Sequence, residues 1–121
     1  MRYKNHKDGV VQQKKDYSKK IIFSLSDFLE KGHLLQEVTI PPLTQQRLHK
    51  HYKQTEVWYI LEGECSIFIN GKEYLSTSGD AFIASPGEPH QLWNKTNKDF
   101  KVVVFKINMP EDSEDTEWLE G

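Results

Sequence analysis

The chain has 121 residues, which suffices for one domain with a single hydrophobic core and leaves no room for a second. Apolar residues make up 36% of it, charged residues make up 28%, and the formal net charge is −2. Nucleic-acid binding needs a basic face, so this balanced charge gives no basis for a nucleic-acid partner. The apolar runs are too short to span a bilayer, which argues against a membrane partner.

The two ends of the chain carry opposite charge. Residues 1–20 hold seven basic and two acidic residues, and six acidic residues without a basic one follow from Pro110 onward. Such runs are typical of solvated or disordered ends. We therefore expect three parts: a basic N-terminal arm (1–16), flexible or docked as an edge strand on a partner subunit, a barrel domain (17–109), and an acidic C-terminal tail (110–121).

Cys65 is the only cysteine, so the chain cannot form an intramolecular disulfide. The N-terminal region also lacks an apolar signal-peptide core. A cytoplasmic location is the resulting expectation. Because Cys65 lies in a strand-like run, we interpret it as a buried structural thiol.

Short runs of β-branched and aromatic residues, separated by Gly, Pro and Asn, recur along the chain. The sequence Asn70-Gly71 predicts a two-residue hairpin, because both central positions of a type I′ turn need positive φ. One short helix is predicted at residues 26–31. This pattern predicts an all-β sandwich or barrel of the jelly-roll type. Its strands are expected at residues 20–24, 34–40, 56–61, 66–70, 72–75, 81–84, 91–93 and 100–108.

A pair of histidines is the first candidate for a metal site. Alternate residues of a strand point to the same side, so Arg47, His49 and His51 share one face if residues 45–51 are extended. His49 and His51 then form a chelating pair, although a surface pair is the ordinary alternative. Glu56 has the opposite strand parity and joins them only if residues 52–55 turn a corner.

Two longer motifs surround these residues. From His49 the sequence reads HKHYKQTEVWYILEG, and from Gly79 it reads GDAFIASPGEPHQLWN. Together they resemble the two signature motifs of the cupin superfamily, in particular its small single-domain metal-binding members, over roughly residues 34–107. Leu43 stands where the first motif usually has Gly, and Ser85 stands where the second usually has Pro. Both departures fall on turn positions, so they bear on local backbone geometry.

The resemblance implies a double-stranded β-helix barrel with metal ligands at His49, His51, Glu56 and His90. Three imidazoles and one carboxylate suit one divalent ion among Fe, Mn, Ni, Co and Zn, and the absence of a thiolate disfavours a soft metal. Octahedral coordination would leave two open positions for water, substrate or dioxygen. A purely structural metal, or histidines that bind none, is the alternative.

Five further residues are candidates for binding a substrate. Arg47 has the strand parity to face the metal and to bind an anion through paired donors, the alternative being a surface arginine or an ion pair with Glu37. Gln54 and Tyr52 are weaker polar candidates. Trp58 and Phe82 could wall a pocket, although aromatic residues at strand spacing more often belong to a core or a dimer interface.

The first functional hypothesis is a metalloenzyme that acts on a small polar or anionic molecule, as a dioxygenase or by isomerase or lyase chemistry. The second is a metal-containing binding or sensing module without turnover. A metal-free sugar epimerase ranks last, because it needs a free histidine base and every histidine of the predicted barrel occupies a ligand position. Open sheet edges and apolar side chains on the presumed outer faces also predict a homodimer.

Overall fold

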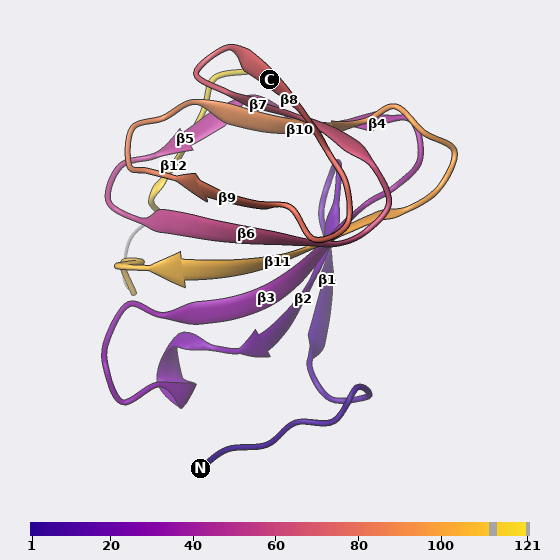
Figure 1. Ribbon diagram of the computed structural model, residues 1–121. Coiled ribbons are helices and arrows are strands. Elements are labelled where there is room, and N and C mark those ends of the chain that lie inside the picture. The colour runs from indigo at the N-terminus through magenta and orange to yellow at the C-terminus, as the bar shows by residue number, and fades with distance from the viewer. Residues whose placement is uncertain (112–113, 121) are drawn as a thin grey trace.

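The computed structural model describes residues 1–111 and 114–120. Two antiparallel sheets face each other around a central space, and this confirms the predicted all-β jelly-roll architecture (Figure 1). One sheet has the order β1-β2-β3-β11-β6-β9 and the other the order β12-β5-β10-β7-β8, with β4 also paired to β10. The strands are β1 Val10–Gln13, β2 Ser18–Phe23, β3 Leu34–Ile40, β4 Thr44–Gln45, β5 His49–His51, β6 Thr55–Glu62, β7 Cys65–Ile69, β8 Lys72–Ser76, β9 Ala81–Ala84, β10 His90–Asn94, β11 Phe100–Ile107 and β12 Thr116–Trp118.

The core is built from strands whose side chains alternate strictly between the interior and the outer face. Along β3 and along β11, every second residue is buried, as expected for strands with one face toward the interior. The two strands pair along seven residues, from Ile40 opposite Phe100 to Leu34 opposite Lys106. The core thus begins at β3, with Leu34, Val38 and Ile40. Its fully buried members include Ile40, Ile60, Ile67 and Phe100.

Two turns show how the local sequence shapes the barrel. Asn70 and Gly71 have φ angles of 53° and 79°, as the predicted type I′ hairpin between β7 and β8 requires. Leu43 has a φ of 55°, a conformation that glycine adopts without steric cost. The position that usually carries Gly in the motif therefore has a left-handed backbone conformation here. Leu43 adopts this conformation at the cost of backbone strain.

Each end of the chain contributes one short strand to a sheet. Strand β1 pairs with β2 of the same chain, and β12, near the other end of the chain, pairs with β5. Most side chains of β1 are nevertheless exposed. The predicted helix at 26–31 is a single 3-10 turn, Leu25–Asp27, in which Ser24 and Asp27 form a capping box.

The outer face of β6 and β9 is rich in exposed apolar side chains. Tyr59 is 51% exposed and Ile83 is 62% exposed, and Leu61 of β6 is exposed as well. We therefore expect two copies of the protein to associate through this face. The dimer should be seen by sedimentation at micromolar concentration. Changing Tyr59 and Ile83 together to Asp should yield a folded monomer. Leu29→Asp is the control: Leu29 is fully exposed outside this face, so this variant should remain a dimer. Sedimentation of the wild type as a monomer would contradict the prediction.

Cys65 is buried, in agreement with its interpretation as a structural thiol, and burial raises its pKa to about 12. Over the described residues, no helix has the length and apolar character that a bilayer crossing requires.

Candidate metal centre

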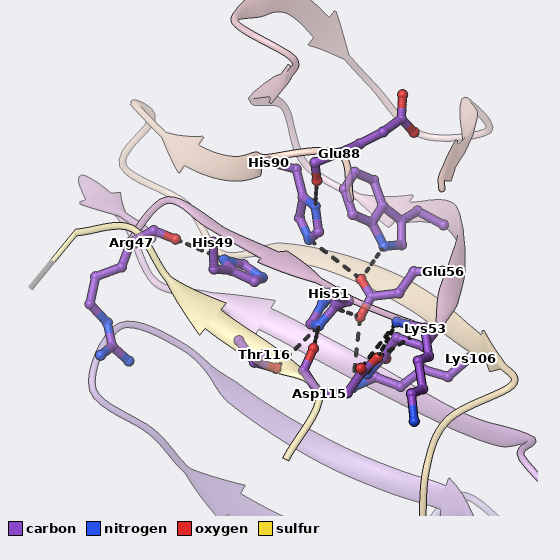
Figure 2. A network of polar contacts seen from close by, with 12 residues as sticks. Arg47, His49, His51, Lys53, Glu56, Glu88, His90, Lys106, Asp115 and Thr116 are labelled. Atoms are coloured by element: carbon purple, nitrogen blue, oxygen red, sulfur yellow. Dashed lines mark hydrogen bonds and ion pairs between the residues drawn. The ribbon is translucent and has the colours of Figure 1, made fainter. Parts of the chain in front are cut away.

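Three histidines from two neighbouring strands meet inside the barrel. His49 and His51 lie on the inward face of β5, and His90 begins β10, whose register places it directly opposite His49. One ring nitrogen from each lies within 4.8 Å of the others, and all three side chains are buried. Figure 2 shows the rings pointing toward one another. The structure therefore brings together the three histidines that the sequence motifs name.

The other ring nitrogen of each histidine is bound to the backbone. Nδ1 lies 2.9 Å from the Arg47 carbonyl in His49 and 3.0 Å from the Glu88 carbonyl in His90. In His51 it lies 3.3 Å from the Asp115 carbonyl. A carbonyl oxygen only accepts, so in His49 and His90 Nδ1 carries the ring proton and Nε2 keeps its lone pair. Nδ1 of His51 also lies 3.1 Å from the Thr116 hydroxyl, which can donate to it. Metal-ligating histidines are oriented by this kind of hydrogen bond.

Glu56, the first inward residue of β6, completes the cluster. Its Oε2 lies 3.1 Å from Nε2 of His51, and its Oε1 lies 3.8 Å from Nε2 of His90 and accepts a hydrogen bond from the Trp58 indole at 2.9 Å. The Nε2 atoms of both histidines are buried without a hydrogen-bond partner. A nitrogen lone pair and a carboxylate this close are stable only with a proton or a cation between them. The four side chains therefore fit a divalent metal ion.

The charge states of these groups also suit a metal. Burial, followed by the neighbouring His90, lowers the pKa of His49 to about 4, and burial likewise lowers the pKa of His90. Burial opposes ionisation of Glu56, but its close contact with His51 and the charge of Lys106 bring its pKa well below the usual range. Neutral imidazoles beside an ionised carboxylate are the forms that coordinate a metal.

The corner that brings Glu56 to the histidines depends on the acidic tail. The carboxylate of Asp115 accepts hydrogen bonds from the backbone N–H of Lys53, at 3.0 Å, and of Gln54, at 2.9 Å (Figure 2). Nearby, Thr116 Oγ1 lies 3.1 Å from Nδ1 of His51. Sequence reasoning assigned this tail to solvent. The only available signal was Thr-Glu-Trp at residues 116–118, a run too short to predict a strand.

We expect Asp115→Ala to lower the free energy of unfolding by about 2–3 kcal/mol, because it leaves the buried N–H of Gln54 and the partly buried N–H of Lys53 without an acceptor. The measurement is chemical denaturation of the metal-free protein. Glu111→Ala removes an exposed carboxylate from the same tail and should change stability by less than about 0.5 kcal/mol. Equal effects of the two substitutions would contradict the role of Asp115.

A cavity of about 320 Å³ opens beside the four residues, near the lower end of the range for small-molecule sites. More basic than acidic side chains line it. The basic ones are Lys14, Lys15, Lys19, Arg47 and Lys106, and the acidic ones are Glu56, Glu114 and Asp115. The cavity is thus positively charged before any metal is added.

Three of the predicted substrate-binding residues line this cavity, namely Arg47, Gln54 and Trp58. Tyr52 and Phe82 are not among the described residues around it. The Tyr52 hydroxyl donates to Glu117 at the surface, and Phe82 packs against the far side of the Trp58 ring system at a centroid distance of 6.3 Å.

Arg47 has its own partners in the structure. Its Nε lies 3.3 Å from an Asp16 carboxylate oxygen, and its guanidinium lies 3.9 Å from the centre of the Trp118 ring. The ion pair predicted as an alternative thus exists with Asp16 instead of Glu37. In Figure 2 the Arg47 side chain turns away from the histidine cluster.

The turn before His90 is stabilised by hydrogen bonds of Ser85, which stands where the motif usually has proline. The Ser85 N–H, which a proline would lack, donates to the Glu88 carboxylate at 2.6 Å, and the Glu88 N–H donates back to the Ser85 carbonyl at 3.2 Å. Gly87 has a φ of 83°, and its N–H donates to the His51 carbonyl at 2.7 Å. This turn ties the two ligand-bearing segments together.

Comparison with known proteins agrees with this fold and site. The family model of the cupin domain matches residues 36–106, so the chain belongs to the cupin family. An uncharacterized protein of Methanocaldococcus jannaschii is 34% identical over 86 residues, which cover 71% of this chain and 68% of that protein. An oxalate-binding protein of Thermotoga maritima is 35% identical over 77 residues, 64% of each chain. The crystal structure of a predicted oxalate decarboxylase from Thermotoga maritima has a TM-score of 0.70 at 30% identity, covering 75% of this chain and 79% of that one.

Proposed function

We propose that this protein binds a small carboxylate at one divalent metal ion held by His49, His51, Glu56 and His90. The observation that carries the proposal is the buried cluster of three histidines, in which the Nδ1–H groups of His49 and His90 are bound to backbone carbonyls and their Nε2 lone pairs lie close to His51 and the Glu56 carboxylate. A histidine packed only for stability has no reason to keep a buried nitrogen unpaired.

The charge of the cavity supports an anionic ligand. Three neutral imidazoles and one carboxylate leave a divalent ion with a residual charge of about +1, and the basic side chains of the lining add to it. A carboxylate that enters this cavity neutralises charge in a partly desolvated space. The names of the two relatives from Thermotoga maritima point to the same class of ligand.

We further propose that the protein is an enzyme with oxygenase, isomerase or lyase chemistry on this ligand. A bound divalent ion would polarise the carboxylate as a Lewis acid. The residues of the chain orient the reactants: backbone carbonyls fix the imidazoles, and the Trp58 indole fixes Glu56. A binding module without turnover is the second candidate, and the 35% identical oxalate-binding relative favours it.

The test separates metal binding, ligand binding and turnover. The chelator-stripped protein is reloaded with Fe, Mn, Co, Ni or Zn, its metal content is measured, and oxalate binding is followed by calorimetry. We expect one ion per chain and oxalate binding that needs the ion. Release of formate and carbon dioxide, or oxygen uptake, would establish an enzyme, and binding without either would establish the module. Equal oxalate affinity of stripped and loaded protein would refute the proposal.

A further inference from the structure

We propose that the ligand carries a second anionic group, bound by Lys19 and Lys106 where strands β2 and β11 line the cavity. This inference rests on the proposed function, since it assigns the class of ligand for the same site: a dicarboxylate.

The two lysines reach the cavity from strands that are far apart in the sequence. Lys19 lies on β2 opposite the buried Val38, and Lys106 lies on β11 opposite the buried Leu34, so both occupy the inward face of their sheet. Both line the cavity, and the Lys106 side chain is only 11% exposed. In the described part of the chain, Lys19 forms no ion pair with a carboxylate.

The positive charges of Lys19 and Lys106 are poorly neutralised by carboxylates. Burial, together with the nearby charges of Lys106 and Lys14, lowers the pKa of Lys19 to about 8, so these groups repel one another. The one carboxylate beside Lys106 is Glu56, at 3.7 Å, and a metal ion would share its charge. An anion between the two ammonium groups would remove the repulsion.

A buried amide faces the same space. Gln36 lies on β3 between the strands that carry the two lysines, lines the cavity and is only 5% exposed. Its Oε1 has no hydrogen-bond partner. If the Gln36 amide is turned by 180°, its N–H₂ faces the cavity and can donate a hydrogen bond to an anion. This bond would satisfy a buried polar group that otherwise lacks a partner.

The hairpin that carries Lys19 is held in place over the cavity. Asp16, in the turn between β1 and β2, accepts hydrogen bonds from the Arg47 backbone N–H at 2.7 Å and from its Nε at 3.3 Å. Arg47 in turn packs on Trp118. Arg47 thus positions the lysine-bearing hairpin, and the two lysines supply the charge that the ligand meets.

The length of the ligand depends on the distance between Lys19 and the metal ligands. Lys106 reaches to 3.7 Å from Glu56, whereas Lys19 lies on β2, which β3 and β11 separate from β6. Oxalate, whose two carboxylates are joined directly, is the shortest dicarboxylate, and succinate, glutarate and adipate span longer distances.

The test compares these three dicarboxylates with the monocarboxylates of equal chain length by calorimetry on the zinc-loaded protein. We expect at least one dicarboxylate to bind about 10-fold or more tightly than its monocarboxylate partner. Lys19→Gln should remove this preference, since loss of a charged hydrogen bond weakens binding by roughly 10- to 100-fold. Metal content should stay unchanged, and monocarboxylate binding should weaken less than dicarboxylate binding.

Matched variants control for folding and for net charge. Lys19→Met keeps the apolar stem and should behave as Lys19→Gln, and Lys19→Arg should retain the preference for the dicarboxylate. Lys101→Gln removes one positive charge from the outward face of β11 and should have no effect. Equal binding of dicarboxylates and monocarboxylates, or equal weakening of both by Lys19→Gln, would overturn the inference. Failure of every metal-loaded form to bind any carboxylate, oxalate included, would instead refute the proposed function.

Discussion

Replacement of His51 by Ala is expected to weaken metal binding by more than 100-fold. His51 supplies one proposed ligand nitrogen, and its Nε2 lies 3.1 Å from the Glu56 carboxylate, so its loss removes a ligand and leaves the buried carboxylate with one partner fewer. Substitution of residues that merely orient ligands typically costs 10- to 100-fold in metal affinity, and loss of a ligand should cost more. Competition with a chromophoric chelator measures the affinity directly.

His33→Ala is the matched control for this experiment. The His33 ring stacks on Phe105, with ring centroids 5.7 Å apart, and contributes to packing outside the cavity. Its replacement should lower stability slightly and leave metal affinity unchanged. Similar losses of affinity in the two variants would contradict the proposed ligand set.

Replacement of Asn94 by Ala is expected to lower the free energy of unfolding by about 3–5 kcal/mol. Asn94 is fully buried, and its Nδ2 lies within 3.1 Å of the carbonyl oxygens of Ile40, Pro41 and Lys98. Its Oδ1 accepts from the Thr96 N–H at 3.0 Å. Alanine would leave these buried backbone groups unpaired and would also leave a cavity.

The measurement is urea denaturation of the metal-free protein, with Asn97→Ala as the control. Asn97 is exposed in the same loop, so its replacement should change stability by less than about 0.5 kcal/mol. A loss below 1 kcal/mol for Asn94→Ala would show that these hydrogen bonds are dispensable. A large loss with unchanged metal affinity would separate the role of Asn94 in the fold from that of His90 on the same strand.

The sequence by itself determined the elements whose cause is local. Strands β3 and β11 follow from runs of β-branched and aromatic residues, and the hairpin at Asn70-Gly71 follows from the φ angles that two neighbouring residues can adopt. His49 and His51 share a face because a strand has a period of two. The two motifs then sufficed to identify the family and to name His90 and Glu56 as candidates.

Only the tertiary structure decided what surrounds those candidates. The bond between Asp115 and the Gln54 N–H joins residues 61 positions apart, and the bond between Asp16 and the Arg47 N–H joins residues 31 positions apart. A run of acidic or basic residues reads the same in a sequence whether it stays in solvent or closes a barrel. The charged ends became part of the cavity because sheet pairing brought β1 to β2 and β12 to β5, where buried N–H groups and an arginine satisfy their carboxylates.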